Sequence, residues 1–221
     1  MRYLILILFW GSLLAACTND DYLHDGGVAN PNVNMTTYDY LKSNPLFDTL
    51  VMTIDKLNLK EEVNAAGTLY APTNFSFTSY IMDELEALRK IQSDTNYTYA
   101  DIPVASLDSV RMYIFKERLT RDDLTKEGKV YTSLLGMEMK LSKEPVSQYT
   151  NDLVNKPEYL YFIKKMGKRF DTYEETVAGT VGQSEKDQRI QVQTSGIITT
   201  TGVVHVLANS HKLVFHAVKN R

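Results

Sequence analysis

Three histidines near the C-terminus are the first side chains whose chemistry has to be considered. His205 alternates with apolar residues in a strand-like pattern, and no cysteine, histidine or carboxylate recurs beside it at metal-ligand spacing. A packed, hydrogen-bonded histidine is therefore expected at this position. His211 and His216 are five residues apart, which does not fit the i, i+4 spacing of helical ligands. We expect both on the surface, and the sequence predicts neither a metal site nor a cofactor.

Adjacent carboxylates form a second group of candidates. They occur at Asp122-Asp123, Glu61-Glu62 and Glu174-Glu175. Neighbouring side chains diverge along a strand or a helix, so such pairs cannot readily share a substrate, and solvated faces are expected. The sequence also has no glycine-rich phosphate loop, no Gly-x-Ser-x-Gly elbow and no catalytic Cys-His arrangement. No enzyme activity is predicted.

Aromatic and basic side chains gather in one later segment. An exposed arrangement of this kind could stack on sugar rings or hold an anionic partner, because aromatic faces would lie beside cations. The alternative is that strand alternation directs half of the aromatic rings into the core while the lysines only solubilise a turn. The candidate binding residues are Tyr159, Tyr161, Lys164, Lys165, Lys168, Arg169 and Tyr173, with Phe162 and Phe170 among them.

Cys17 is the only cysteine, which excludes a disulfide framework and a thiolate zinc site. Arg2 precedes the apolar run Tyr3–Trp10, which is too short to cross a bilayer. The run leads into Leu-Ala-Ala-Cys at residues 14–17, which resembles the bacterial lipobox. This resemblance implies a signal peptide over residues 1–16 and a mature chain held on the membrane by lipid on Cys17.

Residues 17–35 are polar and acidic, without hydrophobic periodicity, and are expected to form a flexible tether. Asp20, Asp21 and Asp25 lie close to Cys17, an arrangement that resembles the export signal of surface lipoproteins in Bacteroidetes-type bacteria. Outer-membrane anchoring that faces the cell exterior is the prediction that follows. The alternative is a solvated spacer on a protein that faces the periplasm.

Composition narrows the class of partner. The chain has 221 residues, of which 43% are hydrophobic, and 24 Lys and Arg against 27 Asp and Glu give a net charge of −3. This balance offers no attraction to a phosphate backbone, so nucleic acids are not expected as partners. The length suits one domain, over residues 36–221.

The first half of the chain is predicted to be mainly helical. Thr36 or Thr37 offers an N-cap hydroxyl, Gly67 suits a left-handed C-terminal cap, and Thr73 or Asn74 is expected to cap the helix after it. The apolar spacing predicts helices from residue 37 and over 46–57, 61–66, 73–91 and 106–119.

Strands dominate the second half. Beyond Arg121 the apolar period changes from 3.6 to 2, and Gly136 is expected to join two strands by a turn. Because helices precede strands, the fold class is predicted to be α+β. Strands are expected at 68–71, where Pro72 ends the first of them, and at 130–135, 137–141, 159–163, 190–194, 202–207 and 212–215.

Three segments, in order, resemble the fasciclin domain family. They are Thr68–Phe77, which contains Ala-Pro-Thr-Asn, then Met112–Phe115 with its tyrosine, and Thr194–Leu207 with Gly-Val-Val-His-Val-Leu. The resemblance implies one domain in which helices pack on a β-sandwich or wedge. The signature residues that it assigns to the fold are Pro72, Thr73, Asn74, Tyr113, Gly202 and His205.

The chain departs from that family at three places. Ile114 stands where the family has a histidine proposed to contribute to adhesion, and Thr201 stands where asparagine usually precedes the closing glycine. The stretch 142–189 is longer than the family core requires, so we expect it to add one or two strands as an elaboration.

The resemblance implies a cell-adhesion module that acts through contacts with an extracellular protein or glycan. Two alternatives remain open at this point: a periplasmic envelope scaffold, and an accessory glycan-binding lipoprotein of a nutrient-uptake system. The sequence determines neither the ligand nor the oligomeric state.

Overall fold

The computed structural model describes residues 30–65, 67–146 and 156–215. The predicted signal peptide, Cys17, most of the predicted tether and His216 lie outside the described residues. No helix within the described ranges combines the length and apolar character that crossing a bilayer requires.

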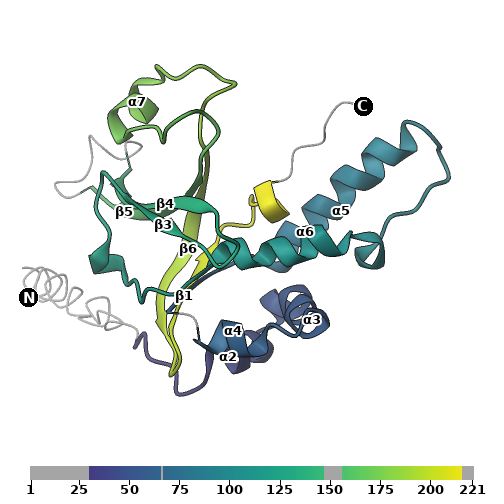
Figure 1. Ribbon diagram of the computed structural model, residues 1–221, viewed down its shortest axis with the longest axis horizontal. Helices are drawn as coiled ribbons and strands as arrows, with labels where there is room; N and C mark the ends of the chain where they lie inside the picture. Colours follow the sequence, from purple (N-terminus) through teal and green to yellow (C-terminus); the bar gives the residue numbers. More distant parts are fainter. Residues whose placement is uncertain (1–29, 66, 147–155, 216–221) are drawn as a thin grey trace, which may run out of the picture. The chain divides into compact units, whose positions relative to one another are not determined.

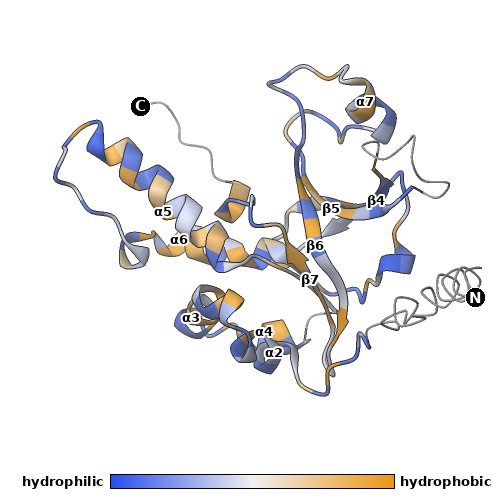
Figure 2. Cartoon of the chain, turned by 180° about the vertical axis from the view of Figure 1, so that it is seen from behind, coloured by the Kyte–Doolittle hydropathy of each residue, from blue (hydrophilic) through white to orange (hydrophobic). Residues whose placement is uncertain are grey.

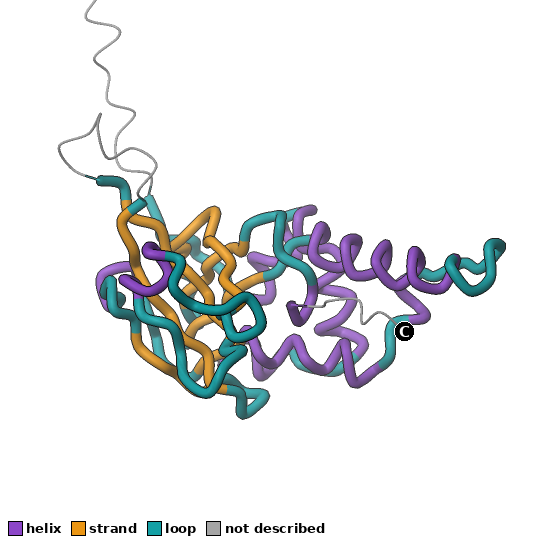
Figure 3. Tube along the Cα trace, turned by 90° about the horizontal axis from the view of Figure 1, so that it is seen from above, coloured by secondary structure: helices purple, strands orange, loops and turns teal. Residues whose placement is uncertain are grey.

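Short helices lead into the domain and one long helix follows the first strand (Figure 1). Thr36 caps the first helix as predicted, because its hydroxyl accepts from the Asp39 amide at 3.2 Å. The helical elements are α2 (Thr37–Ser43), η3 (Pro45–Phe47), α3 (Asp48–Lys56), α4 (Lys60–Ala65), α5 (Asn74–Arg89), η4 (Tyr99–Asp101), α6 (Val104–Asp108), η5 (Ser109–Tyr113), η6 (Arg121–Asp123), α7 (Tyr173–Ala178) and η8 (Leu213–Phe215). Figure 3 shows most of these helices on one side of the strands.

The strands form one sheet in the order β2-β1-β7-β6-β5-β4-β3. Only β1 and β7 pair in parallel; the other neighbours are antiparallel. After β3, the Leu134 amide donates to the Ile114 carbonyl of β2 at 2.8 Å, so the two edges of the sheet approach each other. The strands are β1 (Thr68–Ala71), β2 (Ile114–Phe115), β3 (Lys129–Thr132), β4 (Glu138–Pro145), β5 (Glu158–Lys164), β6 (Gln188–Ile198) and β7 (Val203–Leu207).

The core lies against the inner face of this sheet and is rich in aromatic rings. Phe162 of β5 packs between Tyr70, at 5.1 Å between ring centroids, and Tyr113, at 5.5 Å. All five residues of β7 are buried, and Figure 2 shows this strand largely in the hydrophobic colour. The predicted α+β class is confirmed.

The side chains of the Pro-Thr-Asn segment at the start of α5 do not cap this helix as predicted. Thr73 is the N-cap residue, but its hydroxyl donates to the Asn209 carboxamide at 3.0 Å and not to the helix. Asn74 accepts from the Thr49 amide at 2.9 Å and donates to the Pro45 carbonyl at 2.7 Å. The expected capping was therefore wrong: these side chains tie the start of α5 to the segment after β7 and to the start of α3.

Gly136 was predicted to make a turn and Gly67 to cap a helix, and only the first prediction is confirmed. Gly136 has a φ of 82° in the turn between β3 and β4, as expected. Gly67 does not adopt a left-handed conformation, so the predicted cap is wrong. A Cβ atom at Gly67 would lie 2.3 Å from the carbonyl carbon of Glu117, so glycine is needed here because two backbones approach closely.

One predicted helix ends earlier than expected, and one predicted strand is a helical turn. The helix predicted over 106–119 ends at Tyr113, because Ile114 is extended and pairs with Leu69 of β1. The strand predicted at 212–215 is wrong: η8 replaces it, with Val214 in the left-handed region at φ 53°. Lys164 donates to the Val214 carbonyl at 3.3 Å, which holds this turn against β5.

The segment 142–189, predicted to add one or two strands, contributes β5, which lies between β4 and β6 within the sheet, and the connection 165–187 with α7, which lies outside the strand ladder. The predicted tether differs at its end. At the end of the predicted tether, the Val33 amide donates to the Ile198 carbonyl at 2.8 Å and Ile198 donates to Pro31 at 2.8 Å. Residues 31–35 are thus bound to the end of β6 and are not free.

His205 is a packed histidine, as predicted. It is fully buried, its Nδ1 accepts from the Gly196 amide at 3.1 Å, and its Nε2 donates to the Leu119 carbonyl at 3.0 Å. Burial lowers the pKa of the ring to about 4. The expectation of a surface position for His211 was wrong, since this side chain is 2% exposed and burial lowers its pKa to about 3.

Acidification is expected to destabilise the domain through these two rings. In the unfolded chain this histidine binds a proton below about pH 6.5, whereas buried His205 in the folded chain binds one only near pH 4. The stability contributed by neutral His205 is thus complete above pH 6.5, and on the order of 2–3 kcal/mol of it is lost as the pH falls toward 4. Urea unfolding at several pH values should show a shallower pH dependence for His205→Gln than for the natural chain. Identical slopes would mean that His205 does not titrate differently on folding.

Candidate functional site

The outer face of β4, β5 and β6 carries polar and aromatic side chains. Antiparallel pairing places Ser142 opposite Tyr161, Glu144 opposite Tyr159, and Tyr161 opposite Gln191. Cross-strand partners point to the same side of a sheet, so these residues share one face, opposite to that of Phe162. The outer face is therefore the polar side of the strands that form the aromatic core.

A buried ion pair lies at the centre of this face. Arg189 pairs with Glu144, and their side chains are 13% and 4% exposed. The Ser142 hydroxyl donates to Glu144 at 2.6 Å, and the Arg189 guanidinium lies over the Tyr161 ring at 4.8 Å. Burial and then the negative charge of Glu144 raise the pKa of Tyr161. Tyr161 is consequently held as a neutral, oriented ring.

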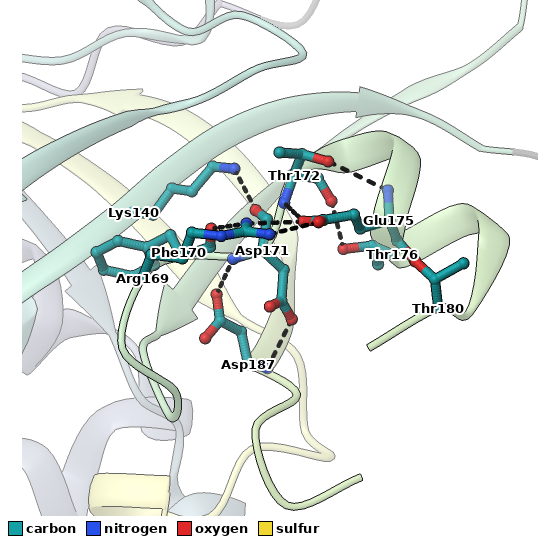
Figure 4. Close-up of polar contacts among 9 residues, drawn as sticks. All are labelled: Lys140, Arg169, Phe170, Asp171, Thr172, Glu175, Thr176, Thr180 and Asp187. Atoms are coloured by element: carbon teal, nitrogen blue, oxygen red, sulfur yellow. Dashed lines mark hydrogen bonds and ion pairs between the residues drawn. The ribbon is translucent and has the colours of Figure 1, made fainter. Parts of the chain in front are cut away.

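The connection 165–187 packs over part of this face (Figure 4). Asp171 and Asp187 hold the two ends of this connection together, because each carboxylate accepts from the other residue's amide at 2.8 Å. Asp187 also accepts from the Met166 amide at 3.0 Å, and Lys140 of β4 donates to the Asp171 carbonyl at 2.8 Å. These bonds fix where α7 begins relative to the strands.

A capping box starts α7. The Thr172 hydroxyl accepts from the Glu175 amide at 3.2 Å, and Glu175 accepts in return from the Thr172 amide at 2.9 Å. Arg169 donates to both carboxylate oxygens of Glu175, at 2.8 and 2.5 Å, and lowers the pKa of Glu175 to about 2. Figure 4 shows this guanidinium directed at Glu175. Glu174-Glu175 is therefore part of a helix start and not an acid-base pair.

Three of the predicted binding residues come together on the outer face. Tyr159 and Tyr161 are half-buried on β5, and Tyr173, half-buried at the start of α7, lies close enough to interact electrostatically with Tyr161. The Tyr173 hydroxyl donates to the Pro145 carbonyl at 3.3 Å, and Lys126 lies over the Tyr173 ring at 5.1 Å. Tyr159, Tyr161 and Tyr173 are called the tyrosine cluster below.

The predicted basic residues do not join this cluster. Lys164 points to the inner face, toward Val214, while Lys165 pairs with Glu138 at 3.0 Å. Arg169 is occupied by Glu175, and Lys168 is exposed on the loop before α7. The predicted basic residues therefore do not form one surface with the tyrosine rings, because strand alternation and local ion pairs separate them.

The cations that do lie beside the tyrosine rings are Arg189 and Lys126, which sequence reasoning missed. Alternation along β6 would have indicated the face of Arg189 once its register was known. Lys126 precedes Tyr173 by 47 residues, and no local pattern connects the two.

Two cavities lie beside α7 and the connection that contains it. The larger, of about 610 Å³, is lined by groups of both signs: Lys168, Arg169, Asp171, Glu175 and Glu185 are among them. Within the described ranges, no group of three or more histidine, cysteine, aspartate or glutamate side chains is arranged to hold a metal ion.

Comparison with known proteins gives a match in fold. No protein-family model matches the chain, and no curated protein matches it in sequence. A solved structure, a FAS1 domain pair from the insect cell adhesion molecule Fasciclin I, is similar with a TM-score of 0.50 and 13% sequence identity. The similarity covers 81% of this chain and 50% of that one. The domain has the fold of a FAS1 domain.

The chain spans half the length of the FAS1 domain pair that it matches. Within this FAS1 fold, the signature residues serve the structure: Pro72 follows β1, Gly202 precedes β7, and Tyr113 is fully buried. Ile114 is 1% exposed in β2, so its side chain is not available to an outside partner.

The buried ion pair is expected to matter for stability far more than a surface pair. Glu144→Gln leaves the Arg189 charge without its counter-ion and should lower the free energy of unfolding by about 3 kcal/mol. The matched control is Glu86→Gln, whose pair with Lys90 is 72% and 68% exposed; its loss should cost about 0.3–0.5 kcal/mol. Urea denaturation of both variants measures the difference, and equal small losses would contradict a buried, uncompensated charge at Arg189.

Proposed function

We propose that this protein is a lipid-anchored, cell-surface binding module that acts in adhesion through protein or glycan contacts, without chemistry of its own. The observation that carries the proposal is the tyrosine cluster on the outer sheet face of a FAS1 fold. The solved FAS1 domain pair belongs to a cell adhesion molecule, and the likeness in fold supports the same class of task for this chain.

The tyrosine cluster suits contact with a flat polar partner. Half-buried tyrosine rings present apolar faces, and their hydroxyls bond at the edge, which is why tyrosine is frequent in interfaces. Arg189 beneath Tyr161 and the bond from Tyr173 to Pro145 hold two of the rings in place before a partner arrives. Such ordering reduces the conformational entropy lost on binding.

Anchoring is the second part of the proposal. A lipobox cysteine acylated at Cys17 holds the chain on a membrane, because several acyl chains anchor stably where one binds only marginally. The acidic residues after Cys17 support export to the outer face. The proposed location is therefore the outer membrane, with the domain facing the cell exterior.

Protease treatment of intact cells tests the location. A protease that does not cross the envelope should remove the domain while a periplasmic control protein survives. Protection of the domain in intact cells, with cleavage only after lysis, would exclude adhesion and favour a periplasmic scaffold.

Alanine at Tyr161 and Tyr173 tests the surface. Each variant should weaken binding to the partner found on glycan and matrix-protein arrays by about ten-fold, since anchors of this kind contribute more than 1 kcal/mol each. Tyr40→Ala is the control, because Tyr40 lies on α2, away from the outer sheet face, and its ring is half-buried against Phe47. Binding losses that merely follow the loss of thermal stability in all three variants would contradict a role for the tyrosine cluster.

A further inference from the structure

The two cavities beside α7 share part of their walls, and one of them is small. The smaller has a volume of about 170 Å³ and the larger about 610 Å³, and both are lined by Asp171, Glu175 and Val181. Drug-sized ligands usually occupy cavities of about 300–1,000 Å³, so the smaller cavity suits a more compact molecule. The tyrosine cluster contributes no residue to the described walls of either cavity.

The chain reverses direction after α7 and forms one wall of the smaller cavity. Gly179 adopts the left-handed conformation at φ 65°, and its amide donates to the Glu175 carbonyl. The Lys186 amide then donates to the Gly182 carbonyl at 3.0 Å, which closes a second turn. This turn brings Gln183 and Lys186 to the wall of the smaller cavity.

Two polar side chains of this wall already have partners within the protein. Both carboxylate oxygens of Glu175 accept from Arg169. The Thr176 hydroxyl donates to the Thr172 carbonyl at 2.8 Å and accepts from Arg189 at 3.3 Å. These groups are therefore not available to a ligand.

Asp171 has one carboxylate oxygen that is not used. The side chain is 6% exposed, and its Oδ2 accepts from the Asp187 amide, beside which Figure 4 shows it. Its Oδ1 accepts from none of the described residues and is not fully enclosed by them, so it opens into the cavities that Asp171 lines. The nearby ammonium of Lys140 donates to the main-chain carbonyl of Asp171 instead. A buried carboxylate oxygen without a donor favours a positively charged donor from a ligand.

Lys186 supplies the opposite charge to the smaller cavity. None of the described carboxylates forms an ion pair with its ammonium, and the Gln183 carboxamide likewise has no partner among the described residues. By contrast, Lys165 in the same connection is paired with Glu138 at 3.0 Å. The wall of the smaller cavity thus offers one unused carboxylate oxygen, one unused ammonium group and one unused amide.

We propose that the smaller cavity binds a free α-amino acid with a small side chain. The ammonium group of the ligand would donate to Asp171 Oδ1, its carboxylate would accept from Lys186, and its side chain would pack against Val181. Both unused charges of the wall would then be balanced, whereas a ligand with a single charge would leave one of them without a partner. The proposal goes beyond the adhesive role and uses no residue of the tyrosine cluster.

Calorimetric titration of the full chain with L-alanine, N-acetyl-L-alanine and L-alaninamide tests the ligand class. L-Alanine should bind at least about ten-fold more tightly than N-acetyl-L-alanine, which lacks the ammonium group, and than L-alaninamide, which lacks the carboxylate. Equal binding of N-acetyl-L-alanine would overturn the role of Asp171, and equal binding of L-alaninamide would overturn the role of Lys186. No binding of L-alanine would overturn the whole proposal.

Two variants of the cavity wall locate the site. Asp171→Asn keeps an oxygen that can accept from the Asp187 amide but replaces Oδ1 by a donor, so it should weaken L-alanine binding at least about ten-fold. Lys186→Met keeps an unbranched side chain without the charge and should remove the preference for L-alanine over L-alaninamide. L-Alanine binding that is unchanged in a folded Asp171→Asn variant, or a preference that survives in Lys186→Met, would overturn the proposal.

Matched controls separate the site from the rest of the molecule. Lys165→Met removes the same charge outside the walls of both cavities and should leave L-alanine binding unchanged. Thermal unfolding of each variant establishes that it is folded, and Lys186→Met decides the matter if Asp171→Asn does not fold, because Lys186 is exposed. Tyr161→Ala should weaken adhesion without altering L-alanine binding, so each proposal can fail without the other. A loss of L-alanine binding in Tyr161→Ala would overturn the assignment to this cavity.

Discussion

The packing of Phe162 between Tyr70 and Tyr113 is the contact on which the rest of the structure depends. It joins β5 to β1 and to the turn before β2, segments that are far apart in the chain. Side chains in a strand alternate between the two faces, so once Phe162 is buried, Tyr159 and Tyr161 must face outward. A shift of one residue would bury these tyrosines and expose the core ring.

The outer face is polar, and part of it is nevertheless buried beneath the connection that contains α7. Burying Glu144 and Arg189 costs solvation free energy, which their mutual attraction and the bonds to Ser142 and Thr176 offset. The geometry of such a pair is restrictive, because each charge needs its partner in place. This restriction orients Tyr161 and helps to make the tyrosine cluster an ordered surface.

Strand alternation gives the two faces of the central strands different surroundings. On the outer face, rings backed by cations offer a broad contact surface suited to a macromolecule. On the inner face, Lys164 donates to the Val214 carbonyl and so holds the turn after β7 against β5. β5 supplies Tyr161 to the outer face and Lys164 to the inner face, so strand alternation separates the two side chains.

The sequence by itself determined the α+β class, the strand at 159–163 and the burial of His205, because hydrophobic period and turn residues act over short distances. It also predicted Tyr161 as a binding residue. Only the tertiary structure decided that Lys164 and Tyr161 lie on opposite sides and that Lys126 and Arg189 accompany the tyrosine rings. The physical reason is that a period specifies which neighbours share a face, whereas contacts between distant segments depend on register and packing. His211 shows this most clearly: nothing near it in the chain predicts burial, and its position is set by Tyr113, 98 residues earlier.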